Sequence, residues 1–213
     1  LSGCFGRDVF QNQFAGMDFG NQTVTLRWNH LFSPKLFSNI SLIHSLYDYE
    51  LGTPSGQPNG FQWRSNMKDQ SIKADFTYYS NPQLTIKFGL QSIYHQFNPG
   101  FAKGVGEETL FTEFKVPDNY AFEHGAYFMA EDKILPKLSF KAGLRLSVFQ
   151  NIGEAMSYEY DNDYQVIDST FYENGEIYNT YLGLEPRLGM NYTINEQNSV
   201  KASYSRTRQY VQL

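Results

Sequence analysis

The four histidines are the residues of this sequence most able to bind a metal ion. His30, His44, His95 and His124 fall in separate predicted strands, and no two neighbouring histidines have the short spacing of paired metal ligands. A metal site needs several such side chains gathered around one ion. The spacing therefore favours histidines held by nearby polar groups over a metal centre, and we expect no metal site.

Acidic residues offer two further candidates for chemistry. Asp161, Asn162 and Asp163 could supply oxygen ligands to calcium, but the cluster lacks the glycine and the terminal glutamate of a calcium-binding loop. A solvated acidic loop is the favoured interpretation. No second feature makes the adjacent Glu107 and Glu108 a catalytic acid pair.

The motifs of the common enzyme classes are missing from the sequence. It has no nucleophile elbow, no glycine-rich phosphate-binding loop and no cysteine pair, and its single cysteine excludes a disulfide framework. The formal net charge of -5 argues against nucleic-acid binding, which needs a basic surface. We therefore predict no catalytic residues, no cofactor and no enzymatic activity.

The stretch 138–149, LSFKAGLRLSVF, shows which elements must position the polar side chains. Its even-numbered positions are apolar from Leu138 to Val148, whereas its odd-numbered positions include Lys141, Gly143 and Arg145. This alternation predicts a strand with one apolar and one polar face. Strands of soluble proteins usually run for about 5–6 residues, whereas a tilted strand needs about 9–11 to cross a bilayer. We interpret the stretch as membrane-spanning.

Composition agrees with a β-barrel in a membrane. The mean hydropathy is -0.48 and no apolar run is long enough for a spanning helix. A barrel needs apolar residues only at every second position, so its average hydropathy resembles that of a soluble protein. Aromatic residues make up 17% of the chain, and a barrel needs them for its two interfacial girdles.

Similar alternation recurs along the chain and predicts about eight long strands in four hairpins. The hairpins turn tightly at residues 33–35, 80–82, 135–137 and 195–198. Long connections are expected at residues 52–66, 98–119 and 151–178, and residues 1–21 are expected to be a loop. Pro186 is the weak point of the last hairpin, because proline cannot donate to the ladder.

Short turns alternating with long connections are typical of outer-membrane barrels, whose long loops lie outside the cell. On this polarity both chain ends would lie at the outer rim, and the three long connections would be exposed and mobile. We therefore expect an internal slice of a larger barrel, because the two edge strands of an eight-stranded slice would otherwise lie unpaired in lipid.

Two stretches carry a resemblance to a known family, residues 126–149 and 184–213. They hold an acidic pair before a turn, a Gly-Leu-Arg and a Pro-Arg followed by a small residue and a tyrosine, namely Glu131, Asp132, Gly143, Leu144, Arg145, Pro186, Arg187, Gly189 and Tyr192. As a set, these residues resemble the barrel domain of TonB-dependent outer-membrane receptors. The resemblance covers most of the strand-forming sequence.

The resemblance implies a barrel of about 22 strands that is closed by a plug and imports a scarce ligand. Residues 1–213 would be a single segment of that barrel, without the plug domain. The implied ligand is a siderophore, a vitamin, an oligosaccharide or a peptide, and the implied energy source is the TonB complex. The implied partners are outer-membrane lipid, the plug of the same full-length chain, TonB through the missing N-terminal part, and a surface lipoprotein. The implied location is the outer membrane of a Gram-negative bacterium.

Six charged residues share the polar parity of the predicted strands and are the candidates for facing the lumen, namely Arg27, Lys73, Lys87, Arg145, Glu185 and Arg187. They would contact a plug or a ligand, although solvation of a polar channel accounts for them equally well. If Arg145 is an exposed lumen residue, replacing it with glutamine should cost well under about 1 kcal/mol. The alternative to the whole interpretation is a soluble or surface β-sandwich that binds a glycan or a protein, with the aromatic residues in its core.

Overall fold

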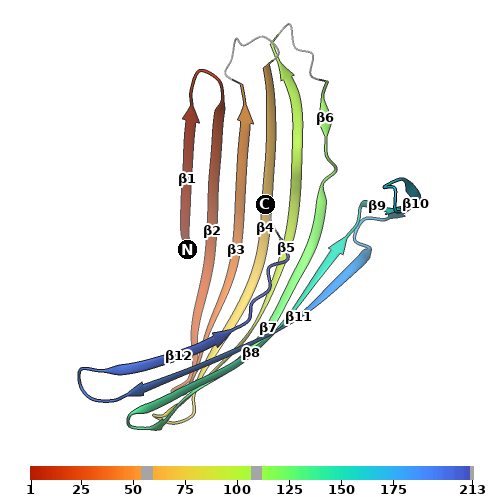
Figure 1. Ribbon diagram of the computed structural model, residues 1–213. Helices are drawn as coiled ribbons and strands as arrows, with labels where there is room; N and C mark the ends of the chain where they lie inside the picture. Colours follow the sequence, from red (N-terminus) through yellow and green to blue (C-terminus); the bar gives the residue numbers. More distant parts are fainter. Residues whose placement is uncertain (54–59, 107–111, 212–213) are drawn as a thin grey trace.

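The computed structural model describes residues 1–53, 60–106 and 112–211. No helix long and apolar enough to cross a membrane occurs among these residues. Glu107 and Glu108 lie outside the described part of the chain. The strands, labelled as in Figure 1, are β1 (Ser2–Gln11), β2 (Gly16–Ser33), β3 (Leu36–Gly52), β4 (Gly60–Tyr79), β5 (Leu84–Val105), β6 (Phe114–Lys115), β7 (Asn119–Leu135), β8 (Leu138–Ile152), β9 (Ala155–Tyr160), β10 (Val166–Tyr172), β11 (Ile177–Thr193) and β12 (Ser199–Ser205).

The long strands form one antiparallel meander. The sheet order is β1-β2-β3-β4-β5-β7-β8-β11-β12, with the short β6 attached to β5, while β9 and β10 pair as a separate hairpin. Figure 1 shows a curved, open sheet with β1 and β12 at its edges and the β9–β10 hairpin projecting beyond β8 and β11. The predicted fold class, an all-β antiparallel sheet of long strands typical of a barrel segment, is confirmed. The described residues do not close it into a barrel.

Short polar side chains hold the tight turns at one end of the sheet. The Oγ of Ser33 accepts two backbone N–H groups in the β2–β3 turn, at 3.3 and 3.1 Å. The Oδ1 of Asn81 does the same in the β4–β5 turn, at 2.9 and 2.8 Å. Asn195 Oδ1 accepts the N–H of Gln197 at 3.0 Å in the β11–β12 turn. These are the local bonds that favour serine and asparagine in turns, and the four predicted turn positions are confirmed.

The side chains of each strand alternate between two faces. On β8, Leu144 and Leu146 are 47% and 48% exposed, whereas Ser147 is 1% exposed. Along most of each strand the register pairs even-numbered residues with even-numbered residues in neighbouring strands, and the parity changes only past a bulge, as where residues 60–64 of β4 pair with residues 101–105 of β5. One face, called here the apolar face, therefore carries Leu26, Trp28, Leu42, Ile72, Leu90, Phe128, Leu144, Leu146, Leu182, Leu184 and Leu188, all of them exposed. The odd-numbered residues form the opposite, polar face.

Burial in this sheet is the reverse of that in a soluble protein. The buried residues include Ser41, His95, Ser147 and Glu185, all on the polar face, while the large aliphatic side chains lie exposed on the other. Soluble proteins rarely expose contiguous apolar patches larger than a few hundred Å². The apolar face must therefore meet an apolar medium or another apolar surface.

The height of the apolar face matches the thickness of a bilayer. On β8 the apolar positions run from Leu138 to Val148, and Gln150 follows them on the same face. At about 3.3 Å per residue this length is about 36 Å, which spans about 26 Å when the strand tilts by about 45°. Tyr94 and Phe122 lie beside Gln150 in the register, with ring centroids 5.3 Å apart. Aromatic residues at this position are typical of an interfacial girdle.

Several predicted loops are in fact strand, which is a correction to the sequence interpretation. Residues 1–21 form β1 and the start of β2, joined by a short turn, so long and short connections do not alternate throughout. The main sheet therefore contains β1 as a further long strand beside the eight expected ones. Of the loops predicted at 52–66, 98–119 and 151–178, residues 54–59 and 107–111 lie outside the described part of the chain, and most of the described remainder belongs to strands. Beyond the apolar band neither face has to be uniformly apolar, so the sequence loses its period of two there.

The two chain ends also differ from expectation, since neither lies at the rim of the sheet. Ser2 pairs with Thr25 midway along β2, and the C-terminal segment lies against the polar face (Figure 1). The chain leaves the β11–β12 ladder at Pro186, whose carbonyl accepts the N–H of Arg206 at 3.1 Å. In a strand the N–H and C=O of one residue point to the same neighbouring strand. Because the Pro186 carbonyl points towards the β12 side, the N–H that proline lacks would also have pointed there. The β12 ladder accordingly ends at the preceding pair, Arg187 and Ser205.

Candidate functional site

A row of charged side chains crosses the polar face on five neighbouring strands, and we call it the charged band. Its members are Asp69 of β4, His95 of β5, Glu123 of β7, Arg145 of β8, and Glu185 and Arg187 of β11. They come together because each strand places its odd-numbered residues on this face, and the register brings these positions to similar heights.

Arg145 is the centre of the charged band. Its guanidinium lies 3.8 Å from Glu123 Oε1 and 3.9 Å from Glu185 Oε1, and it donates to Gln91 Oε1 at 3.5 Å. Glu185 also has Arg187 at 3.7 Å. The Arg145 side chain is 19% exposed and that of Glu185 is 6% exposed, so solvent screens this pair weakly.

His95 lies between the carboxylates of Asp69 and Glu123 at the other end of the charged band. Its Nδ1 lies 2.8 Å from Asp69 Oδ1, and its Nε2 lies 3.9 Å from Glu123 Oε2. The ring stacks on Phe97, with centroids 5.5 Å apart and an interplanar angle of 18°. The carboxylate contact and the stacking fix the imidazole in one orientation.

Two glycines make room for the large side chains of this face. A Cβ on Gly125 would collide with the guanidinium of Arg145, and one on Gly89 would collide with the ring of Tyr127. The Tyr127 hydroxyl donates to Asp75 Oδ1 at 2.6 Å across Gly89. Large side chains therefore cover glycines on the neighbouring strand, a packing that stabilises sheets at such positions.

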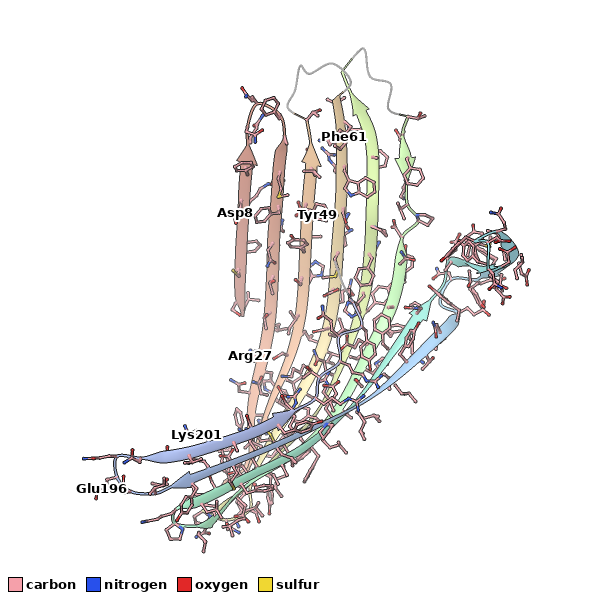
Figure 2. All side chains as sticks on the ribbon, in the orientation of Figure 1. Asp8, Arg27, Tyr49, Phe61, Glu196 and Lys201 are labelled. Atoms are coloured by element: carbon pink, nitrogen blue, oxygen red, sulfur yellow. The ribbon has the colours of Figure 1, made fainter. Side chains whose placement is uncertain are left out.

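A cavity of about 630 Å³ lies on the polar face near the ends of the strands opposite the tight turns. We call it the aromatic–amide cavity. It is lined by Tyr49, Ser65, Asn66, Phe97, Asn98, Pro99, Asn119, Tyr120, Ala121, Phe149, Asn151, Tyr178, Tyr181, Gln209, Tyr210 and Val211. Figure 2 shows that Tyr49 lies nearer this end of the sheet, whereas Arg27 lies nearer the tight turns.

The described residues hold no group of three or more His, Cys, Asp or Glu side chains arranged to bind a metal ion. The polar face carries the weakly screened charges of the charged band and, towards the strand ends opposite the tight turns, the aromatic–amide cavity. This arrangement can bind and orient a polar molecule through hydrogen bonds and ring contacts.

The sequence model described as "TonB dependent receptor-like, beta-barrel" matches residues 2–209. The chain belongs to the TonB-dependent receptor family. The receptors of this family are outer-membrane transporters of Gram-negative bacteria, and the predicted resemblance is confirmed. No curated protein matches the sequence.

Two solved receptor structures share the fold of this chain. The structure titled copper transporter OprC has a TM-score of 0.64 and 11% identity, with 93% of this chain and 33% of that chain covered. The structure of BauA, the ferric preacinetobactin receptor from Acinetobacter baumannii, has a TM-score of 0.50 and 11% identity, with 84% and 36% covered. The present receptor chain therefore spans about a third of the length of these structures.

The receptor sheet brings together only some of the six residues selected from the sequence. Arg145, Glu185 and Arg187 are in contact within the charged band. Lys73 forms a separate pair with Asp75, at 3.0 Å. The other two also lie apart: Arg27 donates to Ser41 Oγ at 3.4 Å, and Lys87 lies between Thr77 and Met129 in the register.

The sequence analysis missed three members of the receptor's charged band, Asp69, His95 and Glu123. The sequence favoured a histidine held by nearby polar groups at His95 but did not name its partners, and the two carboxylates were not considered. A usable signal was present: His95 has the same parity as Lys87 and Gln91 on β5. Extending each strand past the apolar band while keeping its parity would have placed all three on the polar face.

The β9–β10 hairpin gives the receptor an acidic projection. Residues 153–176, which hold the hairpin and its flanks, contain seven Asp and Glu residues and no Lys or Arg. At its tip the Asp161 carboxylate accepts the N–H groups of Asp163 and Gln165, at 2.9 and 2.8 Å. These bonds give the acidic cluster a structural role in the turn, which favours the solvated-loop interpretation.

Proposed function

We propose that this chain forms part of the wall of an outer-membrane receptor barrel that imports a scarce ligand with energy delivered by TonB. The apolar face would meet lipid and the polar face would line the lumen. The reversed burial of the sheet carries this proposal, because a buried polar face and an exposed apolar band about 26 Å high suit a wall between lipid and a polar interior.

The charged band supports a role for the polar face in holding another polar surface. Under this proposal the lumen-facing residues are Arg27, Lys73, Lys87, Arg145, Glu185 and Arg187. Their partners would be the plug of the full-length chain and the ligand. The plug would in turn contact TonB, and a surface lipoprotein would bind the outer side of the barrel. The two solved structures are described as a copper transporter and a ferric preacinetobactin receptor.

A soluble β-sandwich that binds a glycan or a protein is the competing function. A sandwich would bury its apolar face against a second sheet. The described residues form one long sheet and one short hairpin, and Leu90 and Leu182 on the apolar face are each 63% exposed. The exposed apolar face therefore favours the membrane receptor.

Transport is tested with the full-length gene in its host. We expect the protein in the outer-membrane fraction, with heat-modifiable mobility on gels. Accumulation of a radiolabelled ligand should stop when the gene is deleted or the inner membrane is uncoupled. The probes are maltohexaose, a ferric catecholate siderophore and cupric ion. Recovery of the protein in the soluble fraction would contradict the proposal. So would accumulation of a probe that is unchanged by deletion of the gene and by uncoupling of the inner membrane.

The orientation of the sheet predicts a labelling asymmetry on intact cells. Cysteine introduced at Asn162, at the tip of the β9–β10 hairpin, should react with a membrane-impermeant maleimide. Cysteine at Pro136, in the tight β7–β8 turn, should react only after cell lysis. Cys4 is exposed, so the test requires a Cys4→Ser background. The opposite pattern would show that the long connections lie on the periplasmic side.

A further inference from the structure

The lining of the aromatic–amide cavity is free of formal charge. Among its described lining residues there is no Asp, Glu, Lys, Arg or His, although the charged band crosses the same face. A charged ligand would lose its hydration here without gaining an opposite charge, which is unfavourable.

Flat aromatic surfaces form one part of this lining. Phe149 is 6% exposed, and its ring stacks on Tyr210 with centroids 5.2 Å apart and an interplanar angle of 10°. Tyr181 lies at the edge of Phe149, with centroids 6.4 Å apart. The Tyr210 hydroxyl lies 2.8 Å from Ser147 Oγ. A neutral ring with a hydroxyl group therefore already occupies the face of Phe149 and is hydrogen-bonded at its polar end.

Amide side chains form the other part of the lining. Asn98, Asn119, Asn151 and Gln209 each bring both a hydrogen-bond donor and an acceptor. Asn98 is anchored, since its Nδ2 donates to Asp118 Oδ1 at 3.2 Å. Amides match a ligand whose groups both donate and accept, as hydroxyl groups do. Carboxylates of the ligand would meet no cation, and a soft metal ion would find no Cys, Met or His in the lining.

We propose that the aromatic–amide cavity binds a neutral oligosaccharide, with one sugar ring stacked on Phe149 and its hydroxyl groups hydrogen-bonded by the amides. Sugar rings combine apolar C–H faces with hydroxyl groups, which is the combination that this lining accepts. The volume of about 630 Å³ lies within the usual range of ligand pockets. In the proposed complex the sugar ring takes the place that the Tyr210 ring holds on Phe149 in this structure. This inference rests on the proposed function and names the substrate class of that receptor.

The test is calorimetric titration of the purified full-length receptor in detergent. The neutral probes are maltohexaose, cellohexaose, xylohexaose and mannohexaose, and the charged probes are hexagalacturonic acid and a ferric catecholate siderophore. We expect at least one neutral hexaose to bind and both charged probes to fail. Phe149→Leu, which keeps apolar volume but removes the flat ring, should weaken binding at least tenfold, and so should Asn151→Ala.

Matched controls separate the cavity from the rest of the receptor. Tyr158→Ala and Asn162→Ala remove an aromatic ring and an amide from the exposed β9–β10 hairpin, and both should bind as the wild type does. Folding of every variant is checked by heat-modifiable mobility. Binding of the hexaose that survives Phe149→Leu and Asn151→Ala, or absence of binding by all four neutral hexaoses, would overturn the inference. Siderophore binding with energy-dependent uptake would overturn it and leave the proposed transport function standing.

Discussion

Replacing Leu144 with arginine should destabilise the inserted barrel by about 2–4 kcal/mol, the cost of a basic side chain at the bilayer midplane of a barrel. Leu144 is 47% exposed on the apolar face and lies near the middle of the apolar band, between Phe128 and Pro186 in the register. The guanidinium would have to leave water for hydrocarbon, and the described register neighbours of Leu144 on that face, Phe128 and Pro186, offer no carboxylate to pair with it.

Asn29→Arg is the matched control for this substitution. Asn29 pairs with Asn39 of β3 and has the odd parity of the polar face. It is exposed, so an arginine there keeps its hydration and should change the stability by less than about 1 kcal/mol.

Both variants are made in the full-length receptor. Folding is measured as the heat-modifiable fraction recovered from the outer membrane, and stability by urea titration in lipid vesicles. Normal recovery of Leu144→Arg together with loss of Asn29→Arg would show that lipid and lumen lie on the opposite faces from those proposed.

The period of two along the strands made the fold predictable from sequence within the apolar band. Alternation from Leu138 to Val148 is enforced there because every second side chain meets an apolar medium. The same constraint placed the tight turns, where Ser33 and Asn81 supply the turn bonds. It also showed which parity faces away from the apolar medium, and the charged residues selected from the sequence share that parity.

Beyond the apolar band, on the side away from the tight turns, side chains need not alternate between apolar and polar. The prediction of strands and loops from the sequence failed there. Residues 60–66 and 98–105 continue β4 and β5 as paired strands. Their backbone ladder is satisfied whether their side chains are polar or apolar, so no hydrophobic period marks them. Composition rich in Gly, Pro and Asn then predicts loops where strands exist.

The candidate site depended on information that strand parity alone does not carry. Parity selects Arg145 for the polar face, but its neighbours follow from register across five strands. Glu123 is 22 residues away in sequence and meets Arg145 because Gly125, which pairs with Ser147, leaves space for the guanidinium. The aromatic–amide cavity likewise combines strand ends that are far apart in the sequence.

Arg145→Gln should cost about 2–3 kcal/mol, and this replaces the smaller cost expected for an exposed residue. The Arg145 side chain is only 19% exposed, so the assumption of full solvation was wrong. Removing it leaves Glu123 and the nearly buried Glu185 without their shared cation. Loss of one partner from a fully buried pair costs about 3–5 kcal/mol, and the contact distances of 3.8 and 3.9 Å and the remaining Arg187 reduce that value here.

Arg187→Gln is the control that separates burial from charge, because Arg187 also contacts Glu185 but is 50% exposed. It should cost well under about 1 kcal/mol. Adding Glu185→Gln to Arg145→Gln should restore part of the lost stability, because the nearly buried Glu185 carboxylate, which keeps only Arg187 as a cation partner, is then gone while Glu123 remains. The three variants and the wild type are compared by urea titration in vesicles. Equal costs for the two arginine substitutions would show that net charge, and not the buried pair, determines stability. Normal stability of Arg145→Gln with lost uptake would instead assign Arg145 to the plug or the ligand.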